Sequence, residues 1–283
     1  MSRYDIVQTY MVFGGIPYYL SYFKKGMSFE GNADNILFGK NPRLKDEFNR
    51  LFNAIFSNPE DCKKIIRLLA KKHVGFTREE IAKETGLPFG GGLTDTLNAL
   101  VESDFIQRYR PYNVSGKVSF YKLIDNFSLF WLKYVEPNTE DINFMTDNMT
   151  SNIMRVWRGV AFEEVCWQHI GQIKRALGIS GVSSSISAWS VKGNDNKEGV
   201  QIDLLIIRND NVVNLCEMKF AGDIYSIDKE EDAKIRNRIQ TLINTLSPKQ
   251  SVHLTMITTY GVSHTMYGGR VQQQVILDDL FQS

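Results

Sequence analysis

Two acidic residues and a lysine lie in two neighbouring apolar stretches of the chain. Asp203 belongs to the stretch 201–207, and Glu217 and Lys219 belong to the stretch 212–220. The intervening Asn-Asp-Asn favours a turn, so the two stretches predict a β-hairpin. Side chains alternate between the two faces of a strand, which places Glu217 and Lys219 on one face, and the hairpin can fold Asp203 back beside them. Two carboxylates and one ammonium group are therefore expected to converge.

The surroundings of these three charges indicate a cation site. Ionised side chains within apolar strands are costly unless they are paired or coordinate a cation. Two carboxylates suit Mg²⁺, which takes few protein ligands and keeps its waters, and a nearby lysine can orient or deprotonate one of those waters. The Glu-x-Lys triplet alone is more typical of a solvated strand face. In this apolar context, however, it predicts metal-assisted phosphodiester hydrolysis.

The same residues resemble the PD-(D/E)XK nuclease-like fold, in the form fused to the C-terminal part of archaeal-type AAA-family ATPases. The matching motifs, in chain order, are Gly159-x-x-Phe162-Glu163, Ile202-Asp203 and Glu217-x-Lys219.

The resemblance implies a role for each of these side chains. Asp203, Glu217 and Glu163 would bind Mg²⁺ or Mn²⁺, and Lys219 would assist the attacking water. A polar residue on the helix that follows the hairpin would complete the site, and Gln240 is the candidate at that place.

The periodicity from residue 151 onward predicts a compact α/β domain, residues 151–283. Its expected elements are a helix at 152–177, strands at 186–192, 201–207 and 212–220, a helix at 228–246 and a strand at 252–258. This α-β-β-β-α-β order is the core order of the nuclease-like fold, and the whole chain is expected to be an α/β (α+β) protein. The dense charge run 228–238 is interpreted as a solvated, salt-bridged helix surface.

Residues 58–135 predict a winged helix-turn-helix domain. A helix opening at Pro59 is followed by a helix with the capping box Thr77-x-x-Glu80, a third helix at 94–103, and two strands around a wing at 113–117. The third helix has no Arg or Lys and carries Asp95 and Glu102, which argues against strong reading of base edges. Basic residues elsewhere in the domain either contact phosphates or form a solvated surface.

The remaining segments predict packing and connection. Residues 1–57 form a helical segment, and its string Gly14-Gly15-Ile16-Pro17-Tyr18-Tyr19-Leu20 resembles the end of the ATPase lid in the same fused family. The aromatic run 127–134 is expected to be core or inter-domain packing, and residues 136–150 are expected to be a linker. Gly39-Lys40-Asn41 lacks the glycine spacing and the Ser or Thr of a P-loop, so the chain as it stands is not a P-loop ATPase. The resemblance to the ATPase family therefore implies that the chain is either a fragment or a protein that has lost its motor half.

Composition narrows the class of protein. With 283 residues and 43% hydrophobic content, two or three globular units are expected. Residues 1–135 hold 19 Lys and Arg against 14 Asp and Glu, and the rest hold 14 against 18, so the halves carry +5 and −4. The mildly basic first half allows contact with nucleic acid. Three cysteines and the lack of a signal or membrane pattern predict a cytoplasmic protein without a disulfide scaffold.

Two interpretations of the function remain open. The first is a Mg²⁺-dependent nuclease-like protein with a winged helix that binds DNA. The second is a non-catalytic regulatory module of an ATPase-family protein, which binds DNA or a protein partner and uses the acidic residues only in salt bridges. A closed ion pair between Lys219 and an acid would favour the second. The Cys166-x-x-His169 pair lacks a second pair for zinc, and no Gly-x-Ser-x-Gly motif supports a serine hydrolase.

Overall fold

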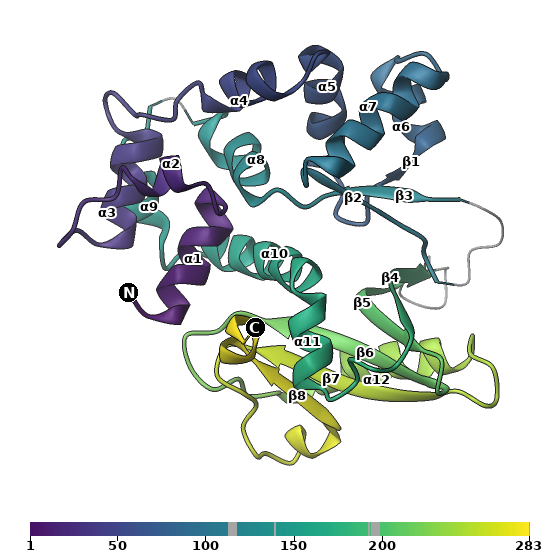
Figure 1. The fold of residues 1–283 in the computed structure, drawn as a ribbon. Helices are drawn as coiled ribbons and strands as arrows, with labels where there is room; N and C mark the ends of the chain where they lie inside the picture. Colours follow the sequence, from purple (N-terminus) through teal and green to yellow (C-terminus); the bar gives the residue numbers. More distant parts are fainter. Residues whose placement is uncertain (113–117, 139, 192, 194–198, 283) are drawn as a thin grey trace. The chain divides into compact units, whose positions relative to one another are not determined.

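The computed structural model of this chain describes residues 1–112, 118–138, 140–191, 193 and 199–282. It mixes helices and strands throughout (Figure 1), which confirms the predicted α/β class. The chain divides into two compact units, one formed by residues 1–108 and 119–164, and the other by residues 109–118 and 165–283.

The first unit is mainly helical. Its first half contains α1 (Arg3–Phe13), α2 (Pro17–Leu20), α3 (Phe29–Ala33), a π-helix (Asp34–Phe38), α4 (Glu47–Ile55) and α5 (Pro59–Leu69). Its second half contains β1 (Phe76–Thr77), α6 (Arg78–Thr85), α7 (Gly91–Glu102), β2 (Ile106–Tyr109), β3 (Phe120–Leu123), α8 (Asn126–Phe130), a second π-helix (Trp131–Val135), α9 (Phe144–Asn148) and α10 (Asn152–Gln168), whose last residues belong to the second unit.

Local sequence signals determine where the helices of this unit begin. Thr77 accepts a hydrogen bond from the backbone N–H of Glu80, whose carboxylate accepts from the backbone N–H of Thr77, so the predicted capping box is confirmed. Pro59 occupies the first turn of α5, and Gly86 ends α6 with a left-handed φ of 71°. The strands β1, β3 and β2 form a small sheet in that order. The predicted wing at 113–117 lies outside the described residues.

Aromatic side chains build the core of the first unit. Phe48 of α4 is fully buried and stacks on Trp131, with ring centroids 4.8 Å apart. Phe127 and Phe130 are also fully buried, so the aromatic run is packing, as the sequence predicts. Residues 136–150, predicted to be a linker, contain α9, whose buried Met145 donates its backbone N–H to Asp34. Part of that segment is therefore packed within the first unit.

The second unit is built on a five-stranded sheet. Its elements are α11 (Ile170–Ala176), β4 (Ser184–Val191), β5 (Val200–Arg208), β6 (Val212–Lys219), α12 (Lys229–Ile243), β7 (Ser251–Thr258), a 3₁₀ turn (Gly268–Arg270), β8 (Gln273–Ile276) and a second 3₁₀ helix (Leu277–Phe281). The strands lie side by side in chain order; β4, β5 and β6 are antiparallel, and β6, β7 and β8 are parallel. Strand β8 is absent from the sequence prediction.

The core of this unit forms where α12 packs on the sheet (Figure 1). Ile235 and Leu242, two turns apart on the helix, cluster with Leu205, Leu215 and other buried side chains of the strands. The opposite face is covered as well, because Leu204 and Leu205 are both fully buried although they are consecutive. The central strands therefore exclude water, and any charge on them needs a partner.

Candidate functional site

The β5–β6 hairpin brings Asp203 and Glu217 together as the sequence predicts. The antiparallel register pairs Leu205 with Leu215 and Leu204 with Cys216. Continuing this register by one residue sets Asp203 opposite Glu217, at a distance where cross-strand side chains interact. Lys219 lies two residues further along β6 and shares the face of Glu217. The turn closes at Asn211, which adopts a left-handed φ of 67°.

A register shift in the neighbouring strand pair marks the position of Asp203. Ser187 pairs with Leu205, whereas Trp189 pairs with Ile202, so Ala188 of β4 faces the two residues Asp203 and Leu204. Such bulges bend a strand and re-aim its side chains, and they are frequent beside active sites. The Asp203 carbonyl accepts a hydrogen bond from the Trp167 indole at 3.0 Å, which holds the bulged backbone in place.

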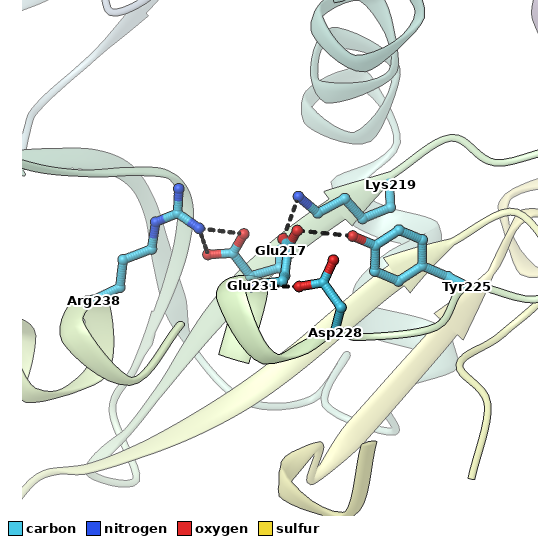
Figure 2. Close-up of polar contacts among 6 residues, drawn as sticks. All are labelled: Glu217, Lys219, Tyr225, Asp228, Glu231 and Arg238. Carbon is cyan, nitrogen blue, oxygen red and sulfur yellow. Dashed lines mark hydrogen bonds and ion pairs between the residues drawn. The ribbon is translucent and has the colours of Figure 1, made fainter. Parts of the chain in front are cut away.

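Glu217 is held by an arginine from α12. Its side chain is only 8% exposed, and Nη1 of Arg238 lies 3.0 Å from each carboxylate oxygen (Figure 2). Arg238 follows Ile235 by one helical turn, so the helix stripe that packs on the sheet also presents this guanidinium. The pair satisfies a charge that would otherwise be buried alone.

Lys219 is held by a second acid from the same helix. Its ammonium group lies 2.6 Å from Oε1 of Glu231, while the Tyr225 hydroxyl donates to Oε2 of Glu231 at 3.0 Å (Figure 2). Glu231 itself is positioned by Asp228, the N-cap of α12, which accepts a hydrogen bond from the Glu231 backbone N–H at 2.8 Å. The lysine is therefore fixed in place and keeps the remaining donors of its ammonium group.

The pKa values of Glu217 and Glu231 shift in opposite directions. Burial raises the pKa of Glu217. The positive charges of Arg238 and Lys219 lower this pKa, whereas the negative charges of Asp203 and Glu231 raise it. The net shift is upward. Burial would also raise the pKa of Glu231, but the hydrogen bond and charge of Lys219 outweigh it and the net shift is downward. Burial is thus the main reason why the ionised form of Glu217 is disfavoured.

The cluster carries more negative than positive side chains. Counting Asp228, four carboxylates face two cationic side chains, Lys219 and Arg238, a formal charge of −2. Among the residues that the structure describes, no three His, Cys, Asp or Glu side chains lie in positions to ligate one ion. Both hairpin carboxylates already accept hydrogen bonds, Asp203 from the Gln201 amide at 2.6 Å and Glu217 from Arg238 at 3.0 Å.

The structure places the other residues suggested by the sequence differently. Glu163 is half-buried on the part of α10 that belongs to the first unit, so its predicted metal role stays a prediction. Gln240 is exposed, and its amide donates to Asn244 one turn along α12 at 3.3 Å. The polar residue that this helix presents to Glu217 is Arg238. The helix surface 228–238 is salt-bridged, as the sequence predicts, but it is not fully solvated: Asp232 is buried, and Glu231 and Arg238 face the strand.

The pKa shifts predict opposite effects for two isosteric substitutions. Because the pKa of Glu217 is raised on folding, its ionisation costs stability as pH rises from the ordinary glutamate value through the raised one. Glu217→Gln should therefore raise the melting temperature at pH 7.5, by about 2–4 °C for each kcal/mol gained in the free energy of unfolding. This gain should disappear below about pH 4, where Glu217 is protonated in both states.

Glu231→Gln serves as the matched control for this prediction. The pKa of Glu231 is lowered on folding, so its ionised form contributes stability that is lost as pH falls. This variant should melt below the wild type at pH 7.5. Calorimetry at several pH values measures both, and a lower melting temperature for Glu217→Gln at pH 7.5 would contradict the assignment.

Comparison with known proteins adds one distant relative. No model of a protein family matches the chain. The chain is similar to uncharacterized protein MJECL04 of Methanocaldococcus jannaschii, with 27% identity over 212 residues. The match covers 73% of this chain and 45% of that protein, so the chain spans less than half the length of its relative. Within the described part of the chain, every helix is too short or too polar to cross a lipid bilayer.

Proposed function

We propose that the second unit is a nuclease-like domain of the PD-(D/E)XK type that hydrolyses phosphodiesters with Mg²⁺ or Mn²⁺. The observation that carries this proposal is the convergence of Asp203, Glu217 and Lys219 on one face of a buried hairpin with excess negative charge. Buried carboxylates that lack full compensation are a common property of sites that bind cations or transfer protons.

Each side chain of the hairpin has a role in this proposal. Asp203 and Glu217 would hold the cation, which when bound would make water a stronger nucleophile and neutralise phosphate charge. Lys219, held by Glu231 and Tyr225, has donors left to orient the attacking water or a phosphate oxygen. Arg238 would compensate Glu217 before the cation binds, and its guanidinium would then be available for a phosphate.

The first unit would supply contact with nucleic acid. The order of α5, β1, α6, α7, β2 and β3 supports the winged helix proposed for residues 58–135. Its α7 carries no Arg or Lys, so we expect contacts with phosphates and little sequence preference. The resemblance to the C-terminal part of AAA-family ATPases and the cytoplasmic location remain parts of the proposal, and the three buried free thiols support a reducing compartment.

A second function competes with the first on a specific observation. Both charges of the Glu-x-Lys motif are already paired, Glu217 with Arg238 and Lys219 with Glu231. A non-catalytic module that binds DNA or a protein would need these acids only for such ion pairs. Under this alternative, a divalent cation would bind no more tightly to the hairpin than to any acidic surface.

Isothermal titration with MgCl₂ and MnCl₂ distinguishes the two functions. The wild type should bind about one ion, and Asp203→Asn should weaken the binding at least tenfold, because one of two anionic ligands is lost. Asp210→Asn is the matched control: Asp210 lies in the turn of the same hairpin, is exposed and is paired with Arg208. Equal affinities of the two variants would favour the non-catalytic module.

A further inference from the structure

The first unit contains a cavity that the proposed function leaves unused. It has a volume of about 850 Å³ and lies between the N-terminal half of α1, residues 23–32, and the start of α10 with the residues before it. This volume is within the range of small-molecule sites. Four apolar residues in its walls are Phe23, Met27, Phe29 and Met149. Methionine side chains adapt to ligands of different shape.

A half-buried arginine in the cavity has only neutral oxygen partners. The guanidinium of Arg158 donates to the carbonyls of Met149 at 2.6 Å and Met154 at 3.2 Å, and to the Tyr4 hydroxyl at 3.4 Å. None of the described contacts of this guanidinium is a carboxylate. A positive charge in a partly dehydrated wall without an anion is costly, so the site as it stands favours an anionic ligand.

An amide side chain lies in the same wall. Gln8 of α1 is 5% exposed, lines the cavity, and makes no side-chain hydrogen bond with the residues that the structure describes. Its amide atoms are not among the buried polar atoms without a partner, so they are open to the cavity. The Gln8 amide can donate to an anionic group that also meets Arg158.

Further charged side chains line the cavity. Lys24 and Lys25 are exposed, while Glu30 and Asp5 supply two negative charges. Asp5 is engaged in the cap of α1 through the hydroxyl and backbone N–H of Ser2. With Arg158 included, the lining carries three positive and two negative side chains, a net charge of +1. The net charge of the lining therefore favours an anion over a cation.

We propose that this cavity binds a small organic anion, whose apolar body lies against the phenylalanine and methionine side chains and whose charged group meets Arg158 and Gln8. The required ligand is amphipathic: an inorganic phosphate would leave the apolar walls unsatisfied, and a neutral hydrocarbon would leave Arg158 uncompensated.

Two fluorescent probes test this proposal, because they share one apolar body and differ in charge. They are 1-anilinonaphthalene-8-sulfonate and its neutral analogue N-phenyl-1-naphthylamine, titrated into the natively folded chain. The sulfonate should bind at one saturable site, and Arg158→Gln should weaken its binding at least tenfold, since a charged hydrogen bond is lost. Arg155→Gln, an exposed arginine of the same helix, should leave the affinity unchanged.

A second variant is needed because Arg158 also hydrogen-bonds to backbone carbonyls, so that Arg158→Gln could weaken binding by disturbing the fold. Gln8→Leu leaves every described hydrogen bond of Arg158 intact; it should weaken binding of the sulfonate and maintain or strengthen that of the neutral probe. Circular dichroism and thermal melting check that each variant is folded. The proposal is overturned if the sulfonate fails to saturate one site, or if neither Gln8→Leu nor folded Arg158→Gln separates the two probes.

Discussion

Asp203→Ala and Glu217→Ala should each abolish Mg²⁺-dependent cleavage of DNA, with a loss of at least about a hundredfold. The two carboxylates are cross-strand neighbours on the hairpin, and in the proposed site a divalent cation would stabilise the ionised form of the buried Glu217. Removing either acid halves the set of anionic ligands. Cleavage of supercoiled plasmid and of single-stranded DNA, with MgCl₂ or MnCl₂, measures the effect.

Lys219→Met separates the chemical step from metal binding in the same assay. The lysine is held by Glu231 at 2.6 Å and approaches the site from the face it shares with Glu217. We expect turnover to fall by about 10²–10⁴-fold, the usual contribution of an acid–base group, while the affinity for metal changes little. Asp210→Asn is the control for charge loss in the hairpin. Undiminished cleavage by Asp203→Ala or Glu217→Ala would reject the nuclease assignment and favour the binding module.

The parts of the site that depend on local sequence are predictable. Alternation along a strand places Glu217 and Lys219 on one face, and a turn of two or three residues determines which residues of β5 face β6. The capping box at Thr77 is predictable for the same reason, because all its hydrogen bonds lie within four residues. These signals need no knowledge of the rest of the fold.

The ion-pair partners of Glu217 and Lys219 depend on tertiary packing, so local sequence patterns do not predict them. Arg238 is 21 residues from Glu217, and Glu231 is 12 residues from Lys219. The helix carries charges on several sides, so composition alone suggests a solvated surface. The spacing of Glu231, Ile235, Arg238 and Leu242 is the signal that could have identified them, since it places two acid–base partners on the stripe that contains the core residues.

The sequence patterns do not predict the bulge at Asp203 or the strand β8, for two different reasons. A bulge is visible only in the register between two strands, and the apolar stretch 201–207 reads the same with or without it. Strand β8 is four residues long and contains two glutamines, which weakens any alternation signal. Its place beside β7 is set by parallel pairing, a long-range interaction that single-sequence patterns do not encode.

The sequence motif and the packing of the structure single out two different, neighbouring acids on α10. The motif Gly159-x-x-Phe162-Glu163 directs attention to Glu163, whereas Glu164 is the acid that is fully buried within the first unit. Its carboxylate lies 2.9 Å from the ammonium group of Lys122 on β3, whose side chain is 6% exposed, and 3.6 Å from the His73 ring. This ion pair joins α10 to the small sheet of the first unit.

Lys122→Met should therefore destabilise the first unit by about 3–5 kcal/mol and lower its melting temperature by roughly 10 °C. The methionine fills the space of the lysine stem but leaves Glu164 as a buried charge, whose remaining ion-pair partner among the described residues is His73. The cost arises from the stranded carboxylate and not from the lost attraction, because desolvation of a charge in the interior exceeds what a single ion pair returns.

A double substitution distinguishes these two sources of the cost. If the stranded charge is responsible, Lys122→Met combined with Glu164→Leu should recover most of the stability, since buried ion pairs replaced by apolar side chains are often neutral. Lys64→Met, which removes an exposed ion pair with Asp61 at 3.6 Å, should change stability by no more than about 1 kcal/mol. Urea unfolding measures all three variants. A double variant as unstable as Lys122→Met would mean that the attraction itself, and not relief of buried charge, maintains this contact between α10 and β3.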